Sequence, residues 1–195
     1  MAVGSDGVLK PNTTQRDEHR QWLADNTNPE NFTGTLQEAL VGADVFIGVS
    51  APNLLDEKDI ETMNQDSIVF AMANPDPEIL PAEASKHAAV VATGRSDFPN
   101  QINNVLAFPG FFRGLLDAGA VDITESMLVA AADAIAATIT EDELNSSYVI
   151  PSVFNERVVG AVSQAVVDVA HQNGSVTKKR NKPQEALDLQ TSFPR

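Results

Sequence analysis

The sequence contains no cysteine, and it has only one tyrosine and one tryptophan among its 195 residues. The absence of cysteine excludes disulfide bonds, thiolate catalysis and cysteine-based zinc sites. No run of about 18 apolar residues is present, so no membrane-spanning helix and no membrane partner are predicted. The N-terminal residues form neither a basic segment nor a long apolar one, so no secretory signal peptide is visible. These absences together predict a cytoplasmic protein.

Basic residues are scarce, since 13 lysines and arginines stand against 27 aspartates and glutamates. The resulting net charge of −14 would repel a phosphate backbone, which argues against a nucleic-acid partner. The one basic cluster, Lys178-Lys179-Arg180, lies in a polar segment that also contains Pro183 and Pro194. We therefore expect a polar, disordered tail over residues 175–195, after a folded domain over residues 1–174.

Short apolar runs alternate with amphipathic stretches along the folded part of the chain. Three runs that are almost continuously apolar predict strands covered on both faces, at residues 44–50, 67–73 and 88–93. The amphipathic stretches predict helices at residues 14–25, 35–40, 56–64, 82–86, 105–116, 124–139 and 154–172. Strands that alternate with helices predict an α/β fold with a Rossmann-like, doubly wound parallel sheet, followed by C-terminal helices.

A Gly-rich turn of the type G-x-G-x-x-G, which seats the pyrophosphate in most dinucleotide-binding domains, is missing. The segment Gly4-Ser5-Asp6-Gly7 follows a strand-like start, but it has neither that spacing nor the helix that should come after it. The sequence therefore predicts a sheet that begins at its second strand and lacks its first strand and first helix.

Neutral amides gather where the predicted strands end. Asn74-Pro75 stops the apolar run IVFAMA, and a block with Asn100, Gln101, Asn103 and Asn104 follows the run VVATG. Such folds bind ligands at the carboxyl ends of their strands, and an uncharged amide that both donates and accepts suits a nicotinamide ring or a hydroxy acid. The spacing alone favours a simple turn at Asn74-Pro75, and it is also consistent with helix capping by Asn103 or Asn104.

Three long segments and the helical end together resemble the NAD(P)-binding domain of malic enzyme. The segments are GADVFIGVSAPNLL (42–55), DSIVFAMANPDPEI (66–79) and VATGRSDFPNQINNVLAFPGFFRG (91–114), and the resemblance covers about residues 1–172. It implies that residues 1–174 form a partial domain of this type. It also implies oxidative decarboxylation of malate to pyruvate and CO2 with reduction of NAD or NADP. In that family Mg2+ or Mn2+ stabilises the developing enolate charge.

The resemblance assigns binding roles to seven residues. Asn74 matches an asparagine that contacts the nicotinamide side and the substrate, and Asn103 and Asn104 match a pair that hydrogen-bonds malate. A cofactor-binding segment is matched by Gly48, Val49, Ser50 and Ala51. The family's catalytic tyrosine and lysine and its metal ligands belong to an N-terminal domain, so no catalytic or metal-binding residue is expected in this chain. The resemblance also implies a homo-oligomer, or dependence on that N-terminal domain.

Three functions stay open at this point. The chain is the cofactor-binding half of malic enzyme, a non-catalytic remnant or partner domain of a full-length homologue, or part of a malolactic enzyme of the same family. The cofactor also stays open between NAD and NADP. Gly4 stands where the family usually has an aspartate for the ribose hydroxyls, and no cation for a 2′-phosphate is evident near it.

Charged residues close to the amides are interpreted as structural. Arg95 and Asp97 are interpreted as an ion pair or loop anchor rather than as a catalytic set. Asp76 and Glu78 lie on a proline-rich turn, so the sequence predicts that both side chains are exposed rather than catalytic or metal-binding.

Overall fold

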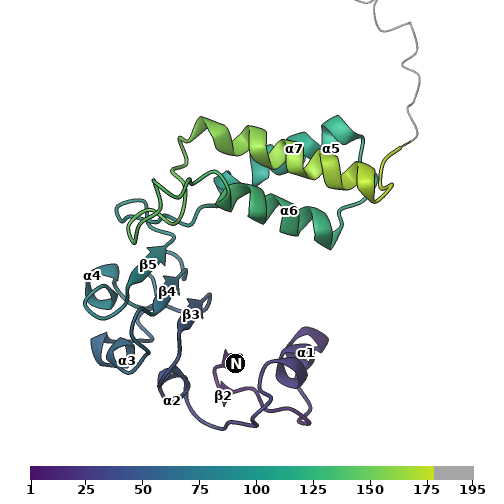
Figure 1. Cartoon of the computed structure of the whole chain (residues 1–195). Coiled ribbons are helices and arrows are strands. Elements are labelled where there is room, and N and C mark those ends of the chain that lie inside the picture. Colours follow the sequence, from purple (N-terminus) through teal and green to yellow (C-terminus); the bar gives the residue numbers. More distant parts are fainter. Residues whose placement is uncertain (178–195) are drawn as a thin grey trace, which may run out of the picture. The chain divides into compact units, whose positions relative to one another are not determined.

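The computed structural model describes residues 1–177, which divide into two compact units (Figure 1). The first unit comprises residues 1–103 and 142–152, and the second comprises residues 104–141 and the chain from Val153 onward. Residues 178–195, most of the predicted tail, lie outside the described residues. The three tail residues before them are paired. Ser175 O accepts from Val121 N, Val176 forms a bridge with Ala120, and Thr177 N donates to Gly119 O.

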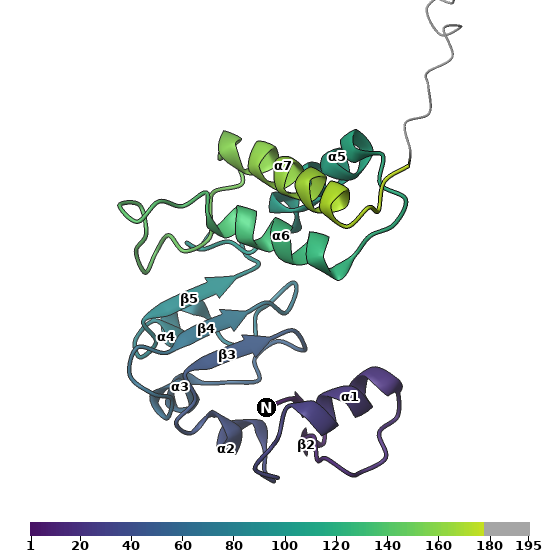
Figure 2. The same ribbon diagram turned by 45° about the vertical axis from the view of Figure 1, so that its right-hand side comes forward.

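A three-stranded parallel sheet lies at the centre of the first unit (Figure 2). Its strands are β3 (Val45–Gly48), β4 (Ile68–Ala71) and β5 (Val90–Thr93), in the order β3-β4-β5. The register pairs the last residues of all three strands, so their carboxyl ends lie level at one edge of the sheet. The predicted α/β fold with a parallel sheet is confirmed.

Short helices cover one face of this sheet. They are α2 (Leu36–Leu40), α3 (Glu57–Glu61) and α4 (Pro81–Ala84), and Figures 1 and 2 show α3 and α4 on the same side. Thr35 starts α2 with a reciprocal cap to Glu38, and Asp56 starts α3 with the same arrangement to Asp59. The buried core of this unit joins the helices to the sheet, and it contains Leu40, Phe46, Leu55, Ile60, Met63, Val69, Ala71, Ile79, Ala84 and Ala88.

The expectation that the strands are buried on both faces is wrong for β3. Phe46 is buried against the helices, whereas Val45 and Ile47 on the opposite face are 49% and 61% exposed. Successive side chains of a strand point to opposite faces, and within the first unit no element covers the second face of β3. A continuous apolar run therefore overstates how much of this strand is covered.

A separate hairpin begins the chain. It consists of β1 (Val3–Gly4) and β2 (Gly7–Val8), and in the described part of the chain β1 pairs only with β2, in antiparallel fashion. The predicted strand end before the Gly4–Gly7 turn is present, but it does not belong to the parallel sheet. The helix α1 (Glu18–Asn26) follows, and Asp17 caps it by accepting a hydrogen bond from Arg20 N.

The second unit consists of helices. They are the 3-10 turn η1 (Asn104–Leu106), α5 (Phe108–Ala118), α6 (Glu125–Ala136) and α7 (Glu156–Gln172), and α7 packs on both α5 and α6. Thr124 stands at the start of α6 as predicted, although its hydroxyl bonds Ser126 rather than the helix backbone.

Two glycines bring α5 and α7 into close contact. A Cβ on Gly110 would lie 2.8 Å from Val159 O, and one on Gly114 would lie 2.6 Å from Ser163 O. The Val162 and Val166 side chains fill the same seam and are fully buried.

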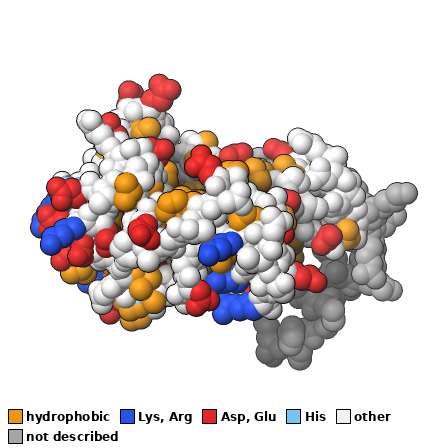
Figure 3. Space-filling model, turned by 90° about the horizontal axis from the view of Figure 1, so that it is seen from below, with side chains coloured by type: hydrophobic (Ala, Val, Ile, Leu, Met, Phe, Trp, Pro, Cys, Tyr) orange, Lys and Arg blue, Asp and Glu red, His pale blue; other side chains and the backbone are white. Residues whose placement is uncertain are grey.

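The surface mixes charges with apolar side chains. Figure 3 shows acidic side chains spread over one face, with hydrophobic ones between them. Within residues 1–177, no helix is both long and apolar enough to span a bilayer.

Candidate functional site

Two loops leave the carboxyl edge of the sheet next to each other. Gly48 ends β3, and the loop after it carries Val49, Ser50 and Ala51. Gly48 is buried, while the other three residues are exposed, Val49 to 75%. The loop after β4 carries Asn74, which is exposed and joined to Pro75 by a cis peptide bond. The structure therefore brings together the predicted cofactor-binding segment and the first of the predicted amides.

A buried carboxylate links these two loops, and the prediction that Glu78 is exposed is wrong. Its side chain is 0% exposed. Glu78 Oε1 accepts a hydrogen bond from Ser50 N at 3.0 Å, and Oε2 accepts one from Ala73 N at 3.0 Å. Burying a carboxyl group is costly unless hydrogen bonds compensate it, and here each oxygen has one backbone donor. Asp76 is exposed, as predicted.

The absence of a side chain at position 48 makes room for this carboxylate. A Cβ on Gly48 would lie 2.5 Å from Glu78 Oε1 and 2.8 Å from Oε2, closer than non-bonded atoms approach. The backbones are also joined, because Met72 N donates to Gly48 O and Leu55 N donates to Glu78 O, each at 3.0 Å. The ends of β3 and β4 thus share one hydrogen-bonded arrangement.

Asn100, the first amide of the block, has a structural role. Its side chain is buried and donates to Val91 O at 3.0 Å and to Ser146 O at 2.8 Å. Its amide oxygen accepts from Val149 N at 2.8 Å. Three of the bonds that this amide can form are therefore made with backbone groups of the same unit.

The remaining amides follow the last strand. Gln101 forms a bridge with Thr93 at the end of β5, and Ile102 N donates to Thr93 O at 2.8 Å, so residues 101–102 lie against the carboxyl end of this strand. Asn103 is half-buried and is the last residue of this stretch of the first unit. Asn104 is exposed and begins η1 in the second unit, and its carbonyl accepts from Ala107 N.

The interpretation of Arg95 and Asp97 as an ion pair is confirmed. Arg95 Nε and Nη2 donate to the two carboxylate oxygens of Asp97, at 2.9 and 2.7 Å, and the guanidinium also stacks over the Phe98 ring. The hydrogen bond from Arg95 lowers the pKa of the Asp97 carboxyl group. Arg95 Nη1 also lies 3.8 Å from Asp76, so the loop after β5 is tied to the loop after β4.

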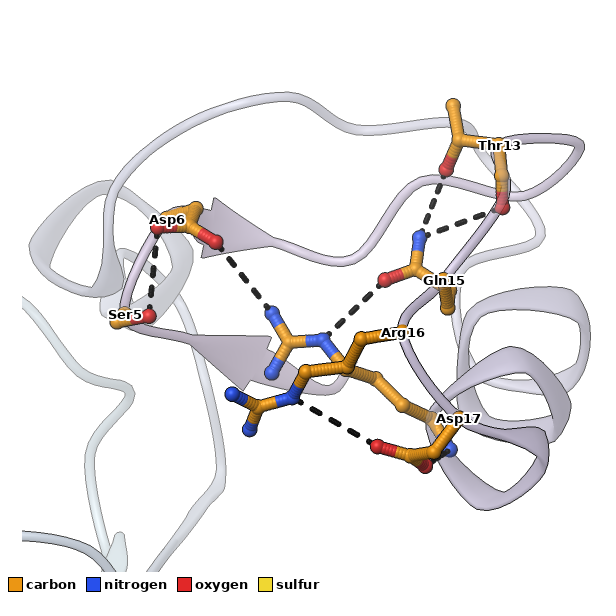
Figure 4. Close-up of polar contacts among 7 residues, drawn as sticks. Ser5, Asp6, Thr13, Gln15, Arg16 and Asp17 are labelled. Carbon is orange, nitrogen blue, oxygen red and sulfur yellow. Dashed lines mark hydrogen bonds and ion pairs between the residues drawn. The ribbon is translucent and has the colours of Figure 1, made fainter.

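A cation that the sequence did not reveal lies beside Gly4. A Cβ on Gly4 would come within 2.7 Å of Cζ of Arg20, whose side chain is only 16% exposed. Figure 4 shows Asp6 and Gln15 directed toward this guanidinium, which donates to Gln15 at 3.2 Å and lies 3.9 Å from Asp6. Arg20 also lines a pocket of about 200 Å³ formed by residues of the hairpin and of the segment before α1. No local motif connects Arg20 to Gly4, because only the fold of α1 against the hairpin makes them neighbours.

A metal site is not formed by these residues. Within residues 1–177, no group of three or more histidine or acidic side chains is placed to hold a metal ion. A dinucleotide fits better, because exposed residues follow β3 and an exposed amide follows β4 at the same edge of a parallel sheet. Together these features define a dinucleotide-binding α/β protein.

Comparison with known proteins identifies the family. Residues 1–172 match the model of the malic enzyme NAD-binding domain, and the chain belongs to this family. The NAD-dependent malic enzyme of Geobacillus stearothermophilus is 54% identical over 94% of this chain, and the bifunctional malic/malolactic enzyme of Bacillus subtilis is 50% identical over 85%. The crystal structure of malic enzyme from Pyrococcus horikoshii covers 83% of this chain at 49% identity, with a TM-score of 0.77.

The likeness extends over part of each relative. This chain spans 38% of the Geobacillus protein, 40% of the Bacillus protein and 37% of the Pyrococcus chain. The recognised domain is therefore about two fifths of the length of these relatives.

Proposed function

We propose that this chain supplies the cofactor-binding part of an enzyme that oxidises and decarboxylates L-malate to pyruvate and CO2 while it reduces NAD(P)+. The observation that carries the proposal is the arrangement at the carboxyl ends of β3 and β4, where Glu78 links the segment Gly48–Ala51 to the segment before Asn74 through Ser50 N and Ala73 N. Membership of the malic enzyme NAD-binding family and the names of the relatives support the reaction.

In this proposal the chain's own residues bind and orient, and they do not transfer protons. The exposed residues 49–51 lie along the cofactor, and the amide of Asn74 holds the nicotinamide within reach of the carbon that gives up hydride. Asn103 and Asn104 hydrogen-bond malate. A neutral amide suits this work, because it fixes a ring or hydroxy acid without adding charge beside a cationic nicotinamide. A bound Mg2+ or Mn2+ would supply Lewis-acid stabilisation of the enolate.

Asn104→Ala is expected to lower kcat/KM for malate at least tenfold, or about 1.4 kcal/mol in transition-state stabilisation, because a substrate hydrogen bond is lost. The measurement is malate-dependent formation of NAD(P)H with Mn2+ present. The assay uses this chain alone and mixed with a separately expressed N-terminal domain of the Geobacillus relative. Asn26→Ala removes an exposed asparagine in α1 and serves as the control. Equal rates for the two variants would remove Asn104 from the substrate site.

A second function has one specific observation in its favour. The Bacillus relative is named a bifunctional malic/malolactic enzyme, so we keep malolactic activity as the alternative. The two reactions differ in their product, because malolactic conversion yields lactate without net reduction of the cofactor. Lactate formed from malate in the same mixture, without accumulation of NAD(P)H, would favour the malolactic reaction. A mixture that is inactive in both assays would favour a non-catalytic remnant or partner domain.

For the cofactor, we propose that Arg20 favours NADP over NAD, because a guanidinium beside the turn after the first strand can pair with a 2′-phosphate. Arg20→Ala is then expected to raise the KM for NADP+ about tenfold and to leave the KM for NAD+ within about twofold, in line with the loss of one charged hydrogen bond. The control is Arg16→Ala, since Arg16 lies outside the pocket and pairs with Asp17. Equal changes for the two cofactors would show that Arg20 only supports the hairpin.

A further inference from the structure

Glu78 occupies a position that neither the family resemblance nor the proposed binding roles explain. It lies in the proline-rich segment after Asn74, and its side chain is fully buried at the end of the sheet. The two backbone donors that it binds are 28 and 5 residues away in the sequence, on different loops. One donor, Ser50 N, belongs to the predicted cofactor segment. The other, Ala73 N, belongs to the residue directly before Asn74.

The two bonds fix the directions of two peptide groups. When Ser50 N points at Glu78, the peptide between Val49 and Ser50 has one orientation, and this sets how residues 49–51 present their exposed side. When Ala73 N points at the other oxygen, the chain enters Asn74 along one path. Because one rigid carboxylate group holds both donors, the separation between the loops is also fixed.

We infer that Glu78 is a positioning residue that holds the loops after β3 and β4 in the arrangement needed to bind dinucleotide and malate together. The inference rests on the proposed function. Glu78 touches neither ligand in this scheme and acts through the backbones of Ser50 and Ala73.

The carboxylate is suited to this task in a way that its amide counterpart is not. A carboxylate has two acceptor oxygens, whereas an amide of the same size has one oxygen and one NH2 group. In a Glu78→Gln variant, one of the two backbone N–H groups would face another donor. The variant therefore keeps the volume of the side chain and removes one of its two attachments, so one loop is released.

The experiment compares Glu78→Gln with Glu61→Gln, which also loses one negative charge but lies exposed on α3. Hydrogen exchange on the intact chain reports the Ser50 and Ala73 amides without any need for activity. Steady-state kinetics, on the mixture with the N-terminal domain, report kcat and the KM values for NAD(P)+ and malate. Glu78→Asp is measured alongside, because it keeps two acceptor oxygens on a shorter side chain.

The expected result is at least tenfold faster exchange at one or both amides in Glu78→Gln, with KM values for cofactor and malate raised together and kcat changed less. Glu78→Asp is expected to lie between wild type and Glu78→Gln, and it carries the test if Glu78→Gln does not fold. Faster exchange with unchanged KM values would show that Glu78 has only a structural role, and it would overturn the inference. Exchange in Glu78→Gln equal to that in Glu61→Gln would also overturn it. An inactive wild-type mixture would instead overturn the proposed function, and the positioning role with it.

Discussion

Asn100→Ala is expected to lower the free energy of unfolding by about 3–4 kcal/mol. The substitution removes a buried amide and leaves the carbonyls of Val91 and Ser146 and the N–H of Val149 without their partner. Each unsatisfied buried backbone group costs about 1–3 kcal/mol, and entry of water offsets part of the total. Asn100 also has a φ of 55°, a left-handed conformation that asparagine tolerates better than alanine does.

Urea denaturation of the two proteins measures this loss, and Asn53→Ala is the matched control. Asn53 has the same φ of 55°, but it is exposed, so its replacement is expected to report the conformational cost alone, about 1 kcal/mol. If both variants lose the same free energy, the hydrogen bonds of Asn100 contribute nothing measurable, and the amide is available for a ligand after all.

Gly48→Ala is expected to destabilise the chain by about 2–4 kcal/mol, because the new methyl group would displace the Glu78 carboxylate. A flexible side chain at the surface would move aside at small cost. Glu78 is instead fully buried, and its displacement breaks the bonds to Ser50 N and Ala73 N. The expected unfolding midpoint in urea therefore falls well below that of wild type.

A double-mutant cycle identifies the cause. If the methyl group acts by displacing Glu78, then Gly48→Ala should cost much less in a Glu78→Ala background than in wild type. Gly160→Ala is the control, since a Cβ there meets no atom within 4 Å and alanine favours the helix by about 0.5–1 kcal/mol. Additive losses at positions 48 and 78 would contradict the contact as the source of the effect.

The structural features that could be predicted from the sequence depend on residues that are close together in the chain. The helix α2, predicted at residues 35–40, needs only the local cap between Thr35 and Glu38, and the strand that ends before Asn74 needs only its own apolar run. The parallel sheet follows from the alternation of such elements. The long segments around Asn74 and Asn104 also sufficed to indicate the family, because their resemblance does not depend on how the chain is folded.

The features that sequence missed depend on residues far apart in the chain. Glu78 stands after two prolines, a context typical of exposed turns, and its burial follows from the alignment of β3 with β4. Asn100 looked like its neighbours in the amide block, but its partner Val149 lies 49 residues further on. No pattern in the sequence connects Arg20 with Gly4, because they become neighbours only where α1 lies against the hairpin. The one-sided burial of β3 could not be predicted either, because all the residues of this strand are apolar.

The close contact between α5 and α7 at Gly110 and Gly114, here called the glycine seam, has a consequence for how these two helices can move. Packed helices in many proteins shift by sliding along each other, which requires side chains that can change rotamer at the contact. Between α5 and α7 the contact is backbone against Val162 and Val166, and the glycines have no side chain to rearrange. A slide along this seam would drive the valines into the neighbouring turns of α5, whose side chains are larger. We therefore expect α5 and α7 to move together as one rigid body rather than to slide along each other.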